Sequence, residues 1–370
     1  MEPAKQDTVT PTLVSAETLT TFVHDVALRC GLSTEHADLF TDALMAADLR
    51  GIPSHGLFRL GIYSRGFLSG NVNPAPRVSE SGDASASRLI DGDNGLGLVV
   101  GQLAMDRAVE LASENGIGMV SVRNSNHSGV LAVHVLRATG AGMVGFFTSN
   151  APALMAPWGA QEALLSNSPF AYGFPARGGP IVVDMACSAV ARGRIRLAAL
   201  DRQPIPLGWA LDAEGNATDD PLAAMEGVVL PMGEYKGSGL AIAHEILATC
   251  LSGAVLSMNV PRVFLKHGAD TLDAWDVGHL AIAINIEALR PRDAFESDVA
   301  ELTDAVRGAT PQPGAGEVLM PGDPEAASVT RLLREGVPVS SETARALSGL
   351  ARELAIAVPT ELGAIAEGNS

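Results

Sequence analysis

The segment IGMVSVRNSNHSGVLAVHVLRATG, residues 117–140, decides the fold. Its first six residues have the apolar character of a buried strand, and residues 130–140 have the periodic apolar pattern of a helix. His127 lies between them, among asparagines, serines and a glycine. Because α/β enzymes keep their chemistry where a strand ends and a helix begins, the segment predicts an α/β enzyme with His127 at its site.

Strands and helices alternate in the same way over the middle of the chain. We expect further strands at residues 87–91, 143–149, 180–185 and 278–286, and further helices at 97–116, 189–201 and 236–253. This alternation predicts a mainly parallel or mixed sheet covered by helices. Both ends of the chain have helical patterns, at 14–31, 33–51 and 57–70 and again at 293–308, 324–336 and 341–355. We therefore expect an N-terminal helical segment at 12–75, a mixed α/β core at 76–290 and a C-terminal helical segment at 291–370 that packs back on the core.

Composition limits the class of partner. The 370 residues include 42 acidic and 25 basic side chains, and the net charge of −17 argues against a nucleic acid or an acidic membrane surface. The three cysteines are far apart and form neither a disulfide framework nor a CxxC metal pair. The N-terminus lacks the regions of a signal peptide, and the most apolar predicted helix carries His244 and Glu245 in its middle. These features predict a cytoplasmic protein that acts on a small molecule.

Three glycines imitate a nucleotide-binding motif. Gly95, Gly97 and Gly101 follow a predicted strand and open a helix, but their spacing departs from the GxGxxG fingerprint and no acidic residue ends the next strand. A Rossmann interpretation would need Arg123 as a ligand for a 2′-phosphate. We favour the alternative that these glycines give a tight entry into a packed helix.

The segment PSHGLFRL, residues 53–60, is a second candidate site. In a helix beginning near Ser54, His55 and Arg59 share one face and point into the same cleft. An arginine binds a carboxylate through two parallel hydrogen bonds, and a histidine exchanges a proton near neutral pH. The alternative is a surface helix with a solvated arginine, just as the alternative for residues 123–130 is a cap and turn with an incidental histidine.

Two further segments offer charge at the start of a helix. Asp184 ends a predicted strand and ACSA follows as a helix start, where backbone N–H groups favour an anion. Lys236, in PMGEYKGSGLA, is placed to meet a phosphate or carboxylate, and its alternative is an exposed helix-start lysine. No metal site is expected, because the eight histidines are scattered and His244 lacks the second histidine of an HExxH motif.

The order of these motifs is more specific than any one of them. PSHGLFRL, RNSNHSG, LLSNSPFAYGFPA, VVDMACSAVARGRI, IPLGWALDAEGNATDDP, LPMGEYKGSGLA and LMPGDPE occur in this order along nearly the whole chain. In this the sequence resembles the malate/L-lactate dehydrogenase family, which also holds sulfolactate and ureidoglycolate dehydrogenases and piperideine-2-carboxylate reductases. The resemblance implies a non-Rossmann α/β fold with a mixed-sheet NAD(P)-binding core, helical N- and C-terminal segments, and a homodimer whose cofactor cleft lies between lobes.

The resemblance also implies roles for individual residues. His127 and His55 match the two histidines that face nicotinamide and substrate, and Arg59 matches the arginine that holds the substrate carboxylate. Further matching residues contact the substrate, namely Ser54, Asn150 and Ser168. Another set matches segments that line the cofactor, namely Asp184, Met185, Ala186, Cys187, Ser188, Tyr235, Lys236, Gly322 and Asp323.

The sequence departs from the family pattern at three places. DMACS replaces the commoner DMATS at residues 184–188, SNSP replaces GTNP at 166–169, and Ala151 replaces a serine that is common after Asn150. Because cofactor contacts in the family run largely through the backbone, the first change costs little. The other two alter polar groups near the substrate.

Three functions remain open at this stage. The resemblance implies hydride transfer between nicotinamide and C2 of a small 2-oxo or 2-hydroxy carboxylic acid, and alternatively reduction of a C=N bond in a cyclic or N-alkyl 2-imino acid. A third alternative is a non-catalytic family member that binds a metabolite, against which the joint presence of His55, Arg59, His127 and Lys236 argues. The choice between NAD and NADP is also open, because Arg192, Arg194 and Arg196 fit either a 2′-phosphate pocket or a solvated helix face.

Overall fold

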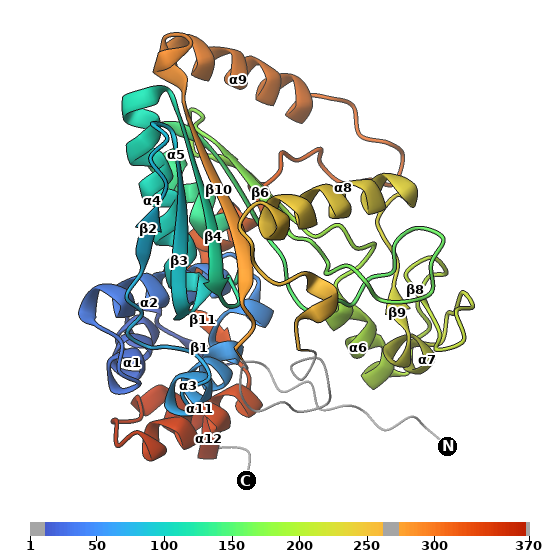
Figure 1. Ribbon diagram of the computed structural model, residues 1–370. Helices are drawn as coiled ribbons and strands as arrows, with labels where there is room; N and C mark the ends of the chain where they lie inside the picture. The colour runs from blue at the N-terminus through green and yellow to red at the C-terminus, as the bar shows by residue number, and fades with distance from the viewer. Residues whose placement is uncertain (1–11, 262–273, 368–370) are drawn as a thin grey trace.

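The computed structural model describes residues 12–261 and 274–367 and has a seven-stranded mixed sheet at its centre (Figure 1). The strand order is β2-β3-β4-β10-β5-β6-β7. The strands are β2 (Ser79–Ser81), β3 (Ser87–Gly95), β4 (Ile117–Ser125), β5 (Met143–Ser149), β6 (Phe170–Phe174), β7 (Ile181–Met185) and β10 (Val277–Asn285). Only β3 and β4 pair in parallel, and the other neighbours in this sheet are antiparallel. The expected mixed-sheet α/β fold without a Rossmann arrangement is confirmed.

Two helices pack side by side against this sheet. α4 (Gly97–Asn115) contacts β4 and β10, and α5 (Ala132–Gly140) contacts β5 and β6. Their apolar faces and the inward side chains of the strands form one core, which includes Val100, Met105, Val120, Phe147 and Ala281. This core fixes the ends of β4 and β7, where the predicted site segments begin.

The two ends of the chain share a second core. β1 (Thr12–Val14) pairs with β11 (Val337–Val339), so the chain ends meet in a small antiparallel sheet. The helices around it are α1 (Ala16–Arg29), α2 (Thr34–Leu49), α3 (Leu60–Leu68), α10 (Asp323–Glu335), α11 (Ser341–Glu353) and α12 (Thr360–Glu367). Buried residues from both ends, including Leu19, Phe40, Tyr63 and Leu347, form a single cluster. The C-terminal helices thus pack mainly on the N-terminal ones.

A third cluster lies beside the far edge of the sheet (Figure 1). It is built from β6, β7 and the elements that follow: α6 (Arg192–Asp201), β8 (Ala210–Leu211), α7 (Pro221–Glu226), β9 (Val228–Val229) and α8 (Tyr235–Glu245), which continues as a π-helical turn at Ile246–Cys250. A single-turn 3-10 helix, Ser257–Asn259, follows, and another, Ile286–Ala288, comes after β10. α9 (Arg292–Arg307) lies apart at the top of Figure 1 and has no buried residue.

The predicted division into 12–75, 76–290 and 291–370 stays a prediction.

The structure corrects one local expectation. Residues 53–59 do not form a single helix beginning near Ser54, but two 3-10 turns, η1 (Pro53–His55) and η2 (Leu57–Arg59). The buried Asp48 carboxylate accepts the Leu57 N–H at 2.6 Å, and a Cβ on Gly56 would lie 2.1 Å from Asp48 Oδ2. The Asp48 carboxylate thus binds a backbone N–H that a continuous helix would use, and it packs against Gly56 between the two turns.

Most expected strands and helices are confirmed, but β6 was missed. Its sequence, FAYGF, sits inside a motif that was interpreted for its polar residues, although β6 pairs with both β5 and β7. No helix within the two described ranges is long and apolar enough to cross a membrane. Residues 1–11, on which the argument about a signal peptide rests, lie outside those ranges.

Candidate active site

The structure brings the two predicted histidines together. His55 ends η1, and His127 lies in the loop between β4 and α5. Their rings are stacked, with centroids 5.7 Å apart and an interplanar angle of 21°. The Trp275 ring meets His127 edge-on at a centroid distance of 6.2 Å. Two motifs 72 positions apart in sequence thus form one imidazole pair.

Tyr63, on α3, helps to fix the tautomer of His127, a role that the sequence did not reveal. The Tyr63 hydroxyl lies 2.8 Å from His127 Nδ1, and the Gly129 backbone N–H donates to the same nitrogen at 3.2 Å. A backbone N–H can only donate, so Nδ1 carries a lone pair and the Tyr63 hydroxyl donates to it as well. The ring proton of neutral His127 is therefore on Nε2. The available signal was the position of Tyr63 one helical turn after Arg59.

Arg59 supplies the positive charge of the site. Its Nε donates to the Ser54 carbonyl oxygen at 2.8 Å, which folds the guanidinium back toward the histidines. Burial, with a smaller contribution from the charge of Arg59, lowers the pKa of His55 to about 4. Burial also holds the pKa of His127 well below its usual value, with Arg59 and then His55 adding to the effect. Both imidazoles are therefore neutral at pH 7.

The loop that carries His127 is clamped by Asn126. The buried Asn126 side chain accepts from the Trp275 backbone N–H at 3.2 Å and donates to Asn94 Oδ1 at 2.8 Å. The loop also lies against the start of α4, where a Cβ on Gly97 would be 2.3 Å from the Asn126 carbonyl oxygen. The same glycine would then be 2.9 Å from the His127 carbonyl oxygen. The glycines thus provide the tight helix entry that we favoured, and Arg123 pairs with Asp91 instead.

Replacing Gly97 by alanine should push this loop out of position. We expect kcat to fall by roughly 10²-fold, the usual effect of a catalytic group displaced by about 1 Å, together with a loss of about 1–3 kcal/mol of unfolding free energy from overpacking. Gly140→Ala is the matched control, because nothing lies within 4 Å of a Cβ at this helical position. Steady-state kinetics and thermal melts of both variants make the test. Unchanged kcat in Gly97→Ala would show that the loop accommodates the added methyl group without displacing His127.

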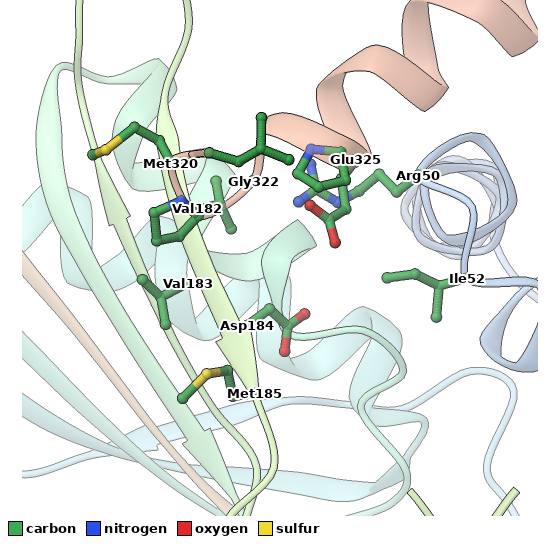
Figure 2. A pocket seen from close by; sticks show the side chains of 12 residues that line it. Arg50, Ile52, Val182, Val183, Asp184, Met185, Met320, Gly322 and Glu325 are labelled. Atoms are coloured by element: carbon green, nitrogen blue, oxygen red, sulfur yellow. The ribbon is translucent and has the colours of Figure 1, made fainter. Parts of the chain in front are cut away.

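A cavity of about 380 Å³ is lined by residues from several segments of the predicted site (Figure 2). It is lined by Arg50, Ile52, Val182, Val183, Asp184, Met185, Leu319, Met320, Pro321, Gly322, Pro324 and Glu325. Ile52 is three residues before His55. On the opposite wall, Asp184 accepts from the Ala132 N–H at 2.8 Å at the start of α5, five residues after His127. Residues that line the cavity are thus close in sequence to His55, and one of them bonds a residue close in sequence to His127.

Burial raises the pKa of Asp184 to about 6. The N–H groups of Ala132 and Leu131 and the charge of Arg50 oppose this rise. Asp184 acts as the cap of α5 from a different strand, since the N-cap residue of that helix, Leu131, contributes no side-chain bond. The carboxylate therefore has a structural role in addition to its predicted role at the cofactor.

The other predicted cofactor residues are divided between the cavity and the interior. Met185 and Gly322 line the cavity, whereas Ala186 is not among its lining residues. Cys187 and Ser188 are buried, with Cys187 Sγ 3.6 Å from His244 Nδ1 and the Ser188 hydroxyl donating to the Val190 carbonyl. The Asp323 carboxylate pairs with Arg307. Their predicted cofactor contacts stay predictions.

Tyr235 and Lys236 lie at the exposed start of α8. Neither side chain forms a hydrogen bond or ion pair with His55, His127 or another residue of the described ranges. Neither residue is therefore joined to the histidine pair by such a bond. Their role at the cofactor stays a prediction.

The predicted substrate residues differ in their surroundings. The exposed Ser54 hydroxyl lies 2.9 Å from His55 Nδ1. The buried Asn150 side chain is occupied by backbone partners, since it donates to the Val255 carbonyl and accepts the Gly278 N–H. Ser168 is buried, with its hydroxyl 3.3 Å from that of Ser166. Ser54 is thus the one of the three that adjoins the histidine pair directly.

In the part of the chain that the structure describes, no three His, Cys, Asp or Glu side chains are grouped to hold a metal ion.

Comparisons with known proteins agree with this architecture. The sequence profile of the malate/L-lactate dehydrogenase family matches residues 14–348. The chain is 33% identical over 351 residues to the malate dehydrogenase of Pyrococcus abyssi, covering 93% of this chain and 95% of that protein. The sulfolactate dehydrogenase of Methanocaldococcus jannaschii matches in structure with a TM-score of 0.88 and 33% identity, over 94% of this chain and 98% of that one. The Δ1-piperideine-2-carboxylate reductase of Pseudomonas syringae pathovar tomato matches with a TM-score of 0.82 and 28% identity, over 92% and 100%. The chain belongs to the malate/L-lactate dehydrogenase family of NAD(P)-dependent oxidoreductases.

Proposed function

We propose that His127, His55 and Arg59 form the active site at which this oxidoreductase transfers hydride between nicotinamide and C2 of a small 2-oxo or 2-hydroxy carboxylic acid. The stacked, neutral histidine pair beside a mostly buried arginine is the observation that carries the proposal. Such a site offers a cation for a carboxylate and a proton donor for the adjacent oxygen. Both are needed when C2 of a 2-oxo acid is reduced.

Arg59 orients the substrate. A planar guanidinium binds a carboxylate through two parallel hydrogen bonds, which fixes the plane of the acid as well as its position. The bond from Arg59 Nε to the Ser54 carbonyl holds the arginine in place beside His55. A substrate without a carboxylate next to the reacting carbon should therefore bind weakly.

His127 donates a proton to the substrate, and Tyr63 donates a proton to His127. When hydride adds to C2, the electron pair of the C=O bond moves to the oxygen, which takes the Nε2 proton of His127. Nδ1 takes the Tyr63 hydroxyl proton at the same time, so His127 remains neutral. Burial raises the pKa of Tyr63 to about 12, and Arg59 opposes the rise by stabilising the phenolate. Because a phenolate is a weaker base than an alkoxide, the transfer runs downhill.

The cavity fits the remainder of the cofactor. When bound, the nicotinamide supplies the hydride at C4 or accepts it there. Asp184, Met185 and Gly322 line this cavity, and they belong to segments that the family resemblance assigns to the cofactor. We propose that these three residues hold the part of the cofactor distant from the reacting carbon.

Reduction of a C=N bond is the second candidate function. The structural match to the piperideine-2-carboxylate reductase supports it, because C2 of a cyclic 2-imino acid also lies beside a carboxylate. The SNSP segment gives less support than its sequence suggested, since Ser166 and Ser168 are buried and hydrogen bonded to each other. The same arginine and histidine would act on either substrate, with nitrogen replacing oxygen as the proton acceptor.

A homodimer is the assembly that the surface of α8 favours. Its exposed face is apolar apart from Lys236, with Leu240, Ile242 and Ile246 at 44%, 44% and 51% exposure. A second copy of the chain would cover this face and would bring Lys236 into an interface. Light scattering should then give a mass of twice 38.2 kDa. Leu240→Glu should give monomers while Leu333→Glu on α10 stays dimeric, and a monomeric wild type would end this proposal.

We also place the protein in the cytoplasm. Cys30, Cys187 and Cys250 are all free thiols, as expected where reducing agents keep thiols unpaired. Fractionation of cells that express the native protein tests this. Recovery in an oxidising compartment would contradict it.

Oxidation of NADH and NADPH, followed at 340 nm, tests the proposed function. The panel is pyruvate, oxaloacetate, a bulkier 2-oxo acid, piperideine-2-carboxylate, and pyruvate with methylamine. Turnover of the 2-oxo acids alone supports hydroxy-acid chemistry, and turnover only where a C=N bond forms supports the second candidate. No turnover together with no binding of NADH or NADPH by fluorescence would favour a non-catalytic metabolite-binding protein.

A further inference from the structure

Arg50 stands out in the cavity because none of the described residues accepts a hydrogen bond from it. Its Nε is inaccessible to solvent, and its guanidinium makes no hydrogen bond or ion pair with a residue in ranges 12–261 and 274–367. Figure 2 shows Arg50 reaching into the cavity from the end of α2, with Glu325 beside it and Asp184 on the opposite wall. The residue as a whole is only partly buried, but a donor that is shut off from water and has no acceptor is costly. This indicates a ligand that supplies oxygen atoms.

The other charged groups of the cavity narrow down this ligand. Asp184 is engaged with the N–H groups at the start of α5, so its charge is partly compensated there. Glu325 lies in the first turn of α10 and has its carboxylate toward the cavity (Figure 2). Asp323, the adjacent acid, is turned away into its pair with Arg307. The cavity thus offers one cation for a phosphate and one carboxylate that accepts hydrogen bonds from hydroxyl groups.

A ribose that carries a phosphate combines these two kinds of group. A guanidinium binds phosphate oxygens through paired hydrogen bonds, and a carboxylate accepts from a pair of ribose hydroxyls. The nicotinamide cofactor contains such a group at its adenosine end, and the cavity is lined by Ile52, three residues before His55, and by Asp184, which bonds the start of the helix that follows His127. Resting on the proposed function, we propose that Arg50 binds the phosphate and Glu325 the ribose hydroxyls of the adenosine half, which makes the enzyme selective for NAD(H) over NADP(H).

The selectivity follows from the charge balance. Two carboxylates and one guanidinium line the cavity, so its walls already carry net negative charge. The 2′-phosphate of NADP(H) would replace a hydroxyl near Glu325 with a group of charge about −1.5 to −2 at pH 7. Repulsion and the loss of a hydroxyl donor then act in the same direction. The three arginines at the start of α6, Arg192, Arg194 and Arg196, do not line this cavity and cannot offset the repulsion there.

Fluorescence titration with NADH, NADPH, ADP-ribose and 2′-phospho-ADP-ribose tests the proposal. We expect wild type to bind NADH and ADP-ribose at least about tenfold more tightly than their 2′-phosphorylated counterparts. Arg50→Gln should weaken ADP-ribose binding by roughly 10- to 100-fold, the usual effect of losing a charge-assisted hydrogen bond. Arg177→Gln, at an exposed arginine outside the cavity, is the matched control. Glu325→Gln should narrow the preference for NADH by at least about fivefold.

The outcomes separate this inference from the proposed function. If wild type turns over a 2-oxo acid but Arg50→Gln binds ADP-ribose as wild type does, the inference is wrong and the function stands. Equal or tighter binding of 2′-phospho-ADP-ribose by wild type would also overturn it, and this arm needs no variant to fold. If wild type binds neither cofactor and turns over nothing, the proposed function itself fails.

Discussion

Replacing His127 by glutamine should lower kcat by roughly 10²–10⁴-fold, the range that a positioned acid or base usually contributes. The glutamine retains a hydrogen-bonding side chain of similar size but cannot pass a proton from Tyr63 to the substrate. KM for the 2-oxo acid should change little, because Arg59 continues to hold the carboxylate. Steady-state kinetics with the best substrate of the panel measure both quantities. Activity within a few-fold of wild type would remove His127 from the proton transfer.

Two further variants test how this proton is delivered. Tyr63→Phe keeps the ring packed against Phe40 but removes the hydroxyl that donates to Nδ1, so kcat should fall with KM nearly unchanged. His55→Gln should have a smaller effect than His127→Gln, since His55 Nδ1 contacts only the exposed Ser54 hydroxyl among the hydrogen bonds seen here. A larger loss in His55→Gln than in His127→Gln would exchange the roles of the two histidines.

A buried histidine in the sheet should make the protein sensitive to acid. His279, on the central strand β10, is fully buried between the hydroxyls of Ser149 and Ser125, each 2.9 Å from a ring nitrogen. Burial lowers its pKa to about 3. The unfolded chain has an ordinary histidine that binds a proton below about pH 6.5. Between these values the unfolded state holds more protons, so the contribution of His279 to stability is full above about pH 6.5 and is lost as pH falls toward 3.

The expected effect is a change in slope. One proton contributes about 1.4 kcal/mol of unfolding free energy per pH unit. His279→Gln should therefore reduce the slope of unfolding free energy against pH by about that amount between pH 4 and 6. The slope of the variant must be compared with that of wild type and not interpreted alone. Burial raises the pKa of Asp48 to about 7, so protonation of Asp48 stabilises the folded protein as the pH falls and partly offsets the effect of His279 in both proteins.

Denaturant titrations at several pH values measure this slope. Ser149→Ala is the matched control, since it removes one hydrogen bond to His279 but keeps the imidazole and should keep the slope. Parallel curves for wild type and His279→Gln would show that His279 is protonated alike in the folded and unfolded chains.

The sequence predicted the elements whose signal is local. The strand, turn and helix of residues 117–140 are confirmed as β4, the His127 loop and α5, because apolar period and turn residues lie within one window. His55 and His127 were predicted from their motifs; the structure stacks their rings, and their catalytic roles stay a prediction. The mixed sheet was predicted as one of two alternatives. The family resemblance, not the periodicity, distinguished it from a parallel one.

The residues that the sequence did not reveal act over long distances in the chain. Tyr63 has an ordinary helical position, and its contact with His127 exists only because α3 and the loop after β4 meet across the core. Asn126 was interpreted as a turn residue, although its side chain connects Asn94 of β3 with Trp275. Arg50 ends a helix, where a positive charge is already explained by its favourable interaction with the helix dipole. Pattern rules see neighbours in sequence, whereas these roles depend on neighbours in space.

Transfer of deuterium from the cofactor to the product tests the central claim most directly. The reaction would use NADH or NADPH labelled with deuterium on either face of nicotinamide C4, the best 2-oxo acid of the panel, and ordinary water. Direct hydride transfer predicts a 2-hydroxy acid with one deuterium at C2 from one of the two labelled faces, detected by mass spectrometry and NMR. A product without deuterium from either face would contradict hydride transfer at this site.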